Sequence, residues 1–162
     1  MELKWGNSCI KLKWNERSRW IIEVKQLRHD HEILASFPVM QQLRPDLQRE
    51  TYLKRIRRLQ QNFRYRLIGV FKQNEIVAVA GFRIVENLAW GKHMYIDDLV
   101  TGEQHRKQGY AQRLFDWLLN EAKTQQCQEV HLDSGVQRFD AHRFYLKNHM
   151  MIRSHHFVKV LK

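Results

Sequence analysis

Residues 95–111 read YIDDLVTGEQHRKQGYA, and this stretch decides the fold. Its first half continues a strand that we expect from His93 to Thr101, and its second half is a polar loop. The loop leads directly into the strongest helical pattern of the chain, in which the apolar residues Ala111, Leu114, Phe115, Leu118, Leu119 and Ala122 share one face. The free N–H groups and the positive dipole end of such a helix form an anion site.

The composition of the loop suits a phosphate group. Gly109 allows the backbone to approach a phosphate closely, and Arg106 and Lys107 add positive charge. An ordinary strand-to-helix connection with a glycine in its turn explains the same residues equally well. The loop alone therefore leaves both interpretations open.

The remaining elements are read from apolar periodicity and turn residues on either side of this segment. A helix is expected from Asp30 to Leu43, broken near Pro38 or ended before Pro45, and a second one follows Asp46 as its N-cap. Further strands are expected at 20–27, 65–71, 76–85, 129–133 and 157–161, and a last helix at 139–147. The order β-α-α-β-β-β-α-β-α-β predicts an α/β fold, a mixed sheet with helices on its faces.

Composition limits the class of protein. The 162 residues suit one domain, expected at 20–162 behind an N-terminal extension at 1–19, and 43% of them are hydrophobic. Two cysteines give no disulfide framework, and no apolar run approaches the roughly 18 residues of a membrane span. No signal peptide is recognised, so we expect a soluble, cytoplasmic protein without a membrane partner. The net charge of +11 attracts polyanions, whether nucleic acid, an anionic membrane or a phosphorylated ligand.

Two motifs resemble one family. Arg106-x-x-Gly109-x-Ala111 matches the (R/Q)-x-x-G-x-(G/A) acetyl-coenzyme A loop of the GNAT superfamily of N-acetyltransferases. The run from Ala141 to Tyr145 is similar to the family's A-x-x-F/L-Y on the following helix. The resemblance covers about residues 20–161 and implies the GNAT fold, a twisted mixed sheet splayed between its fourth and fifth strands.

The resemblance also implies how acetyl-CoA would bind. Leu99, Val100 and Thr101 would pair with the amides of the pantetheine arm, and one N–H group, of Leu99 or Val100, would polarise the thioester carbonyl. The remaining cofactor residues would carry the pyrophosphate: Arg106, Lys107, Gln108, Gly109, Tyr110, Ala111 and Gln112.

Three residues are candidates for catalysis. An alkyl ammonium, with a pKa of about 10.4, must lose a proton before it attacks, and Asp97 and Asp98 are the carboxylates beside the expected cleft. Neighbouring residues of a strand face opposite sides, so we expect one of the two to reach it, and resemblance to the Glu-Asp pair of polyamine acetyltransferases favours Asp97. By family resemblance, Tyr145 would protonate the departing thiolate. A solvated acidic pair and a tyrosine at the edge of the core are the plain alternatives.

Sequence departs from the family pattern at the end of the last helix. His149-Met150 stands where the family usually has Gly-Phe, so Asn148 or His149 must form the helix cap at some cost.

The nine histidines show no zinc-ligand spacing with cysteine or carboxylate, and no metal is expected. Cys127 is expected to be a buried or half-buried thiol.

The basic run Lys54-Arg55-Ile56-Arg57-Arg58 could contact nucleic acid or a membrane, but a solvated helix face is favoured because Tyr52, Ile56 and Leu59 supply the core stripe.

From the family resemblance we expect acetyl-CoA-dependent N-acetyltransfer to a primary amine of a small molecule or peptide by direct attack. A non-catalytic acyl-CoA-binding module and a basic RNA-binding protein are the alternatives. The basic excess opposes a polycationic acceptor, and this conflict eases for an amine of low charge, an amino acid or a peptide terminus. For a polycationic acceptor, Asp97, Asp98 and Glu103 would have to reverse the local field. Many relatives are dimers, which leaves a homodimer open.

Overall fold

The structure is a computed structural model, and it describes residues 22–161. Five strands are present in this range: β1 (Ile22–Gln26), β2 (Arg66–Lys72), β3 (Glu75–Asn87), β4 (Gly91–Thr101) and β5 (Glu129–Leu132). The four α-helices are α1 (Asp30–Leu43), α2 (Arg49–Phe63), α3 (Tyr110–Thr124) and α4 (Phe139–Lys147). The expected extension at 1–19 lies outside the described residues.

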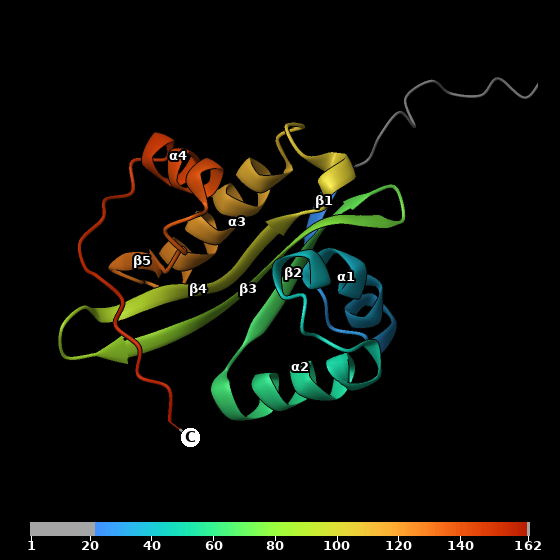
Figure 1. Ribbon diagram of the computed structural model, residues 1–162, viewed down its shortest axis with the longest axis horizontal. Helices are drawn as coiled ribbons and strands as arrows, with labels where there is room; N and C mark the ends of the chain where they lie inside the picture. The colour runs from blue at the N-terminus through green and yellow to red at the C-terminus, as the bar shows by residue number, and fades with distance from the viewer. Residues whose placement is uncertain (1–21, 162) are drawn as a thin grey trace, which may run out of the picture.

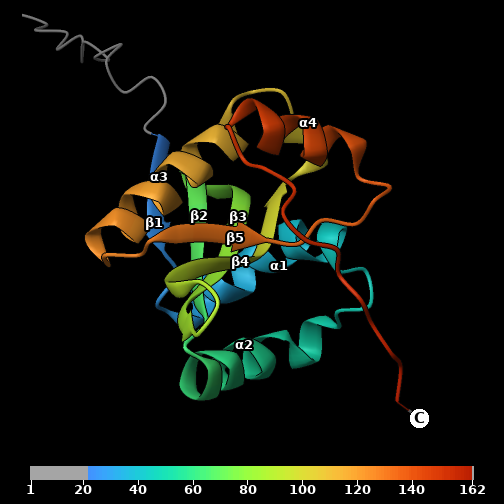
Figure 2. The ribbon, with the colours of Figure 1, turned by 90° about the vertical axis from the view of Figure 1, so that its left-hand side faces the viewer.

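The strands form one mixed sheet in the order β1-β2-β3-β4-β5 (Figure 1). Neighbours from β1 to β4 are antiparallel, and β5 is parallel to β4 because α3 carries the chain back across the sheet between them. Figure 2 shows α1 and α2 on one side of the sheet and α3 and α4 on the other. The predicted α/β architecture, a mixed sheet with helices on both faces, is confirmed.

Two apolar cores follow from this arrangement, one on each face of the sheet. Leu67 and Val79 pack with α1 and α2, whereas Ile68, Ala78 and Ala80 pack with α3. Successive residues of a strand point to opposite faces, so a strand covered on both sides has to be apolar at nearly every position. The run from Ile76 to Phe82 meets this condition, with every residue buried.

The end of α1 agrees with one of the two predicted alternatives, whereas the start of α2 differs from the prediction. The helix α1 continues through Pro38, with Phe37 and Met40 buried on either side of it, and ends before Pro45. Its neighbour α2 begins at Arg49 with Gln48 as N-cap, so Asp46 is not the cap that we expected. Asp46 instead lies in the connection between the two helices, where it lines the cleft described below.

The strand expected at residues 157–161 is wrong. The described residues contain no strand after β5, and the segment that follows α4 runs in an extended conformation along one end of the sheet (Figure 1). Phe157 and Val158 are 90% and 79% exposed. The alternating apolar residues give this segment strand propensity, but a strand also needs a paired neighbour, and no neighbouring strand is paired with this segment.

None of the described helices is long and apolar enough to cross a membrane.

Candidate active site

The central feature of the site is the parting of two parallel strands. The strand β4 pairs with β5 only from His93 to Ile96, but it stays paired with β3 as far as Thr101. Beyond Ile96 the second edge of β4 has no strand partner among the described residues. Leu99, Val100 and Thr101 therefore lie on a strand segment with one free edge.

A β-bulge lies where the strands part. Phe82 is opposite Ile96 and Gly81 is opposite Asp98, so Asp97 is an extra residue without a partner on β3. A bulge disturbs the alternation of side chains between the two faces of a sheet. Asp97 and Asp98 consequently both line the same cleft, and the expectation that only one of them reaches it is wrong.

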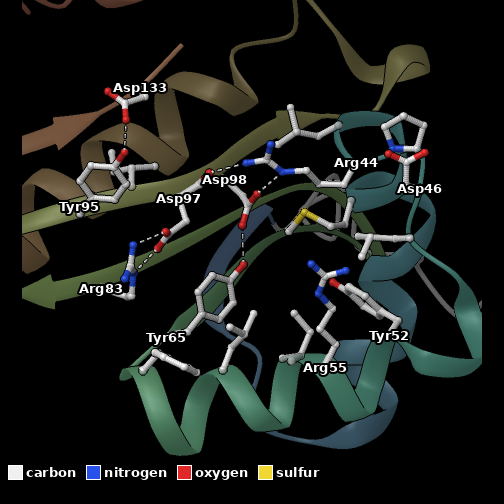
Figure 3. A pocket seen from close by; sticks show the side chains of 18 of the residues that line it. Arg44, Asp46, Tyr52, Arg55, Tyr65, Arg83, Tyr95, Asp97, Asp98 and Asp133 are labelled. Atoms are coloured by element: carbon white, nitrogen blue, oxygen red, sulfur yellow. Dashed lines mark hydrogen bonds and ion pairs between the residues drawn. The ribbon is translucent and has the colours of Figure 1, made fainter. Parts of the chain in front are cut away.

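This cleft has a volume of about 1020 Å³ and lies between the sheet, the end of α1 and the length of α2 (Figure 3). Apolar side chains from α2 and from the connection before it form part of its wall, including Leu47, Leu59 and Phe63. Charged side chains also line it: Arg44, Asp46, Arg55, Arg58, Arg83, Asp97, Asp98 and Asp133. Such a mixed, concave lining suits a polar organic substrate.

Asp97 is held by a bidentate ion pair. Arg83 Nε and Nη2 donate to its two carboxylate oxygens at 2.9 and 2.6 Å. Burial raises the pKa of Asp97 above its usual value, and the Arg83 guanidinium opposes that rise. The carboxylate is thus desolvated, oriented and directed into the cleft, as a group that exchanges a proton with substrate should be.

Asp98 is held from two other directions. Arg44 Nε donates to one of its oxygens and the Tyr65 hydroxyl donates to the other, each at 2.8 Å. Arg44 Nη2 also donates to the carbonyl oxygen of Asp97 at 2.9 Å, so one arginine fixes both residues of the bulge. Burial raises the pKa of Tyr65, and the neighbouring Asp98 raises it further, so this hydroxyl keeps its proton and acts as donor.

A third carboxylate faces the cleft from the end of β5. The Tyr95 hydroxyl donates to Asp133 Oδ2 at 2.5 Å, and His156 Nδ1 lies 3.1 Å from the same oxygen. This contact brings the C-terminal segment to the wall of the cleft.

Sequence reasoning did not find Asp133 or the partners of the three carboxylates: Arg44, Tyr65, Arg83 and Tyr95. One signal was present, because Arg83 is a single charge in the apolar run of β3 and pairs in register with Tyr95. Arg44 and Tyr65 are 54 and 33 positions from Asp98, and Tyr95 is 38 positions from Asp133, so no local pattern connects these pairs.

The loop after β4 has the geometry of an anion cradle. A short 3₁₀ turn (Glu103–His105) leads to Lys107 and Gly109, whose φ angles are +61° and +83°, and α3 then begins at Tyr110 without a side-chain cap. A side chain on Gly109 would meet no atom within 4 Å, so the space in front of the helix terminus is open. The predicted loop residues from Arg106 to Gln112 are therefore brought together around one exposed helix N-terminus.

Tyr145 lies on α4, which packs against α3. The ring of Phe144 meets that of Phe115 edge-on at 5.6 Å, and Gln112 Nε2 donates to Asn148 Oδ1 at 2.7 Å. The second contact ties the end of α4 to the first turn of α3. Burial raises the pKa of Tyr145 and Arg138 opposes that rise, so the half-buried hydroxyl stays protonated at neutral pH.

Two further observations concern the packing of α4 and its C-terminal cap. Phe139 and Leu146 are 67% and 54% exposed, so of these two residues and Phe144 only Phe144 packs against the core. The helix ends with His149 at φ +60°, and the N–H groups of His149 and Met150 donate to the carbonyl oxygens of Leu146 and Tyr145. His149 thus forms the cap that glycine usually forms, at the cost of a left-handed backbone.

Two further groups were considered from the sequence. Among the described residues, no three histidine, cysteine or acidic side chains lie close enough together to hold a metal ion. Cys127 is half-buried, as expected, and burial raises the pKa of its thiol.

Comparison with known proteins agrees with this geometry. The model of the acetyltransferase (GNAT) family matches residues 27–150. The chain is 38% identical over 125 residues to the Bacillus subtilis (strain 168) protein called Uncharacterized N-acetyltransferase YhdJ, covering 77% of this chain and 88% of that protein.

Two solved structures show the same fold at low identity. A ribosomal-protein-alanine N-acetyltransferase from Brucella melitensis biovar Abortus 2308 aligns with a TM-score of 0.75 at 15% identity, covering 88% of this chain and 100% of that one. AAC(6′)-Iy, solved with the bisubstrate analogue CoA-S-monomethyl-acetylneamine, aligns with a TM-score of 0.75 at 12% identity, covering 88% and 99%.

The fold and the two motifs define an acetyltransferase, and the family match makes the class specific: this chain belongs to the GNAT family and is an N-acetyltransferase. Enzymes of this family use acetyl-CoA, and membership therefore implies acetyl-CoA and an acceptor as substrates.

Proposed function

We propose that this chain transfers the acetyl group of acetyl-CoA to a primary amine of a small molecule or peptide by direct attack, without an acyl-enzyme. The observation that carries the proposal is the parting of β4 from β5 after Ile96, which leaves one edge of β4 free beside the cleft. A ligand that contains amides can add to such an edge as a strand would.

The residues of this chain fit acetyl-CoA at both ends of that edge. Leu99, Val100 and Thr101 offer backbone groups to the pantetheine arm, and an N–H of Leu99 or Val100 polarises the thioester carbonyl. The pyrophosphate lies on the backbone from Lys107 to Gln112, with Arg106 beside it. The open space in front of Gly109 supports this placement, since a phosphate needs close access to the helix terminus.

Proton transfer involves three side chains. Asp97, whose pKa burial raises, takes the proton of the acceptor ammonium directly or through water, and Asp98 is the alternative. Arg83 and Arg44 hold these carboxylates in place. Tyr145, protonated at neutral pH, donates its proton to the departing thiolate. The catalytic domain comprises residues 20–162, with residues 1–19 as an extension.

The first experiment is a calorimetric titration of acetyl-CoA into wild type, Gly109→Trp and Thr124→Trp. The control, Thr124→Trp, places the same bulk at the other, exposed end of α3. We expect binding by wild type and the control, and at least about a tenfold loss in Gly109→Trp because the indole fills the cradle. Equal binding by all three would refute the loop assignment.

A second measurement separates an enzyme from a binding module. Release of free coenzyme A thiol is followed with and without a panel of primary amines. Amine-dependent release supports transfer. Tight acetyl-CoA binding without release for any amine would instead support the non-catalytic module.

A further inference from the structure

We infer that the acceptor of this enzyme is an amine that also carries a carboxylate, and that Arg55 and Arg58 of α2 bind that carboxylate. The inference rests on the proposed N-acetyltransfer and specifies its substrate class. Both arginines line the cleft, and Figure 3 shows Arg55 rising from α2 into it. Neither has a hydrogen bond or an ion pair to any other residue that the structure describes.

The other arginines around the cleft are already neutralised. Arg83 is paired with Asp97, and Arg44 is paired with Asp98. On α2 itself, Arg57 is paired with Asp30 outside the cleft. Arg55 and Arg58 are therefore the two cleft arginines whose charge no described residue balances, and they are three positions apart, where like charges repel each other on a helix. An anionic ligand between them removes that repulsion.

Charge is separated across the cleft. The carboxylates of Asp97 and Asp98, at the bulge of β4, and of Asp133, just after β5, lie on the sheet side. Arg83 and Arg44 balance the first two, so the sheet side keeps the negative charge of Asp133. The unpaired arginines lie on the helix side, and only exposed Asp46 on that side is negative. An acceptor whose ammonium points to the bulge of β4 and whose carboxylate points to α2 matches both sides. Arginine binds carboxylates through paired N–H donors, which makes this contact directional.

Apolar side chains of α2 line the cleft together with these charged groups. Ile56, Leu59 and Phe63 come from the same helix and line the same cleft. They suit the hydrocarbon side chain of an amino acid or of a short peptide. A polyamine, in contrast, would place cations against Arg55 and Arg58 in a chain whose net charge is already +11.

The test uses matched acceptors that differ only in the carboxylate. Phenylalanine is compared with phenylalaninamide, leucine with leucinamide, and glycyl-phenylalanine with its amide, with spermidine as the polycation. The amides have less basic amines, a bias that works against our expectation. We expect kcat/KM to be at least about tenfold higher for the carboxylates. In Arg55→Gln/Arg58→Gln this preference should vanish through KM, with kcat changed by less than about threefold.

Lys54→Gln is the control, since it removes a charge from the same helix at a position that does not line the cleft. It should keep the preference, and all variants should bind acetyl-CoA as wild type does. Preference for amides or spermidine, or an unchanged preference in the double variant, would overturn the inference. If acetyl-CoA binds and no amine of any charge is acetylated, the proposed transfer itself fails, which is a distinct result.

Discussion

At the scale of single residues, the two candidate bases are oriented by their neighbours. Asp97 and Asp98 are adjacent in sequence, yet Arg83 holds the first, whereas Arg44 and Tyr65 hold the second. Each carboxylate is thus fixed in orientation before any substrate arrives. Preorganised charge of this kind needs no rearrangement during the reaction.

Tyr145→Phe tests the acid at this scale. We expect kcat to fall by about 10- to 100-fold, because the thiolate then leaves without a proton donor. The affinity for acetyl-CoA and the thermal stability should stay close to those of wild type, since no described residue forms a hydrogen bond with the Tyr145 hydroxyl and the ring contact with Phe144 is kept. Steady-state kinetics beside calorimetry separates the two effects. An unchanged kcat would leave Tyr145 a packing residue.

At the scale of elements, the tyrosine that holds Asp98 depends on a glycine in β3. A Cβ atom on Gly81 would lie 1.8 Å from the Tyr65 hydroxyl oxygen and 2.3 Å from Cζ of that ring. Tyr65 is buried and cannot move away cheaply. The absence of a side chain at Gly81 therefore makes room for the hydroxyl that donates to Asp98.

Gly81→Ala should consequently destabilise the fold by about 2–4 kcal/mol. Gly69→Ala in β2 is the control, because its Cβ would approach Leu27 Cδ2 only to 3.2 Å, and it should cost less than about 1.5 kcal/mol. Urea unfolding measures both. In a Tyr65→Ala background the cost of Gly81→Ala should become small. A similar cost in both backgrounds would show that the ring is not the obstacle.

The start of α1 is stabilised by a carboxylate that also contacts β1. Glu32 accepts hydrogen bonds from the N–H groups of Arg28 and His29 at 3.0 and 3.1 Å, and Lys25 Nζ lies 3.1 Å away. Burial alone would raise the pKa of Glu32, but these three donors together lower it to about 2. A lowered pKa means that the ionised carboxylate stabilises the folded state.

The pH dependence of this contribution has a defined sign. It is complete above the ordinary glutamate value of 4.5 and is lost as the pH falls through the folded-state value of about 2. Glu32→Gln should lower the free energy of unfolding by about 1–2 kcal/mol at pH 7, since solvent screens the contact with the half-exposed Lys25. The difference should shrink between pH 4.5 and pH 2.5. Urea unfolding of wild type and Glu32→Gln across this pH range measures the difference. A difference in unfolding free energy that stays constant with pH would contradict the lowered pKa of Glu32.

At the scale of the whole molecule, one sheet brings the two proposed substrate sites together. The loop before α3 lies at the end of the β4 segment whose second edge is free, and the cleft with α2 lies beside the bulge of the same strand. A single strand thus passes from the acceptor cleft to the anion cradle. The net charge of +11 attracts a phosphorylated ligand to the protein as a whole. Within the cleft, Arg55 and Arg58 of α2 favour an anionic acceptor, as inferred above.

Sequence alone determined the parts of this protein that depend on local order. Helical periodicity located α3, the motif from Arg106 to Ala111 indicated the family, and the apolar run at 76–85 predicted the strand β3. Backbone propensity, periodicity and glycine spacing act over a few residues, so they can be recognised in one stretch of chain.

Tertiary structure decided what depends on pairing across the sheet. The bulge directs both Asp97 and Asp98 into the cleft, and Arg44 meets Asp98 across 54 positions of sequence. The segment at 157–161 has strand propensity and still pairs with no strand. Such contacts follow from register and packing between distant elements, and no local pattern encodes them, because the energy of each pairing depends on which neighbour the fold supplies.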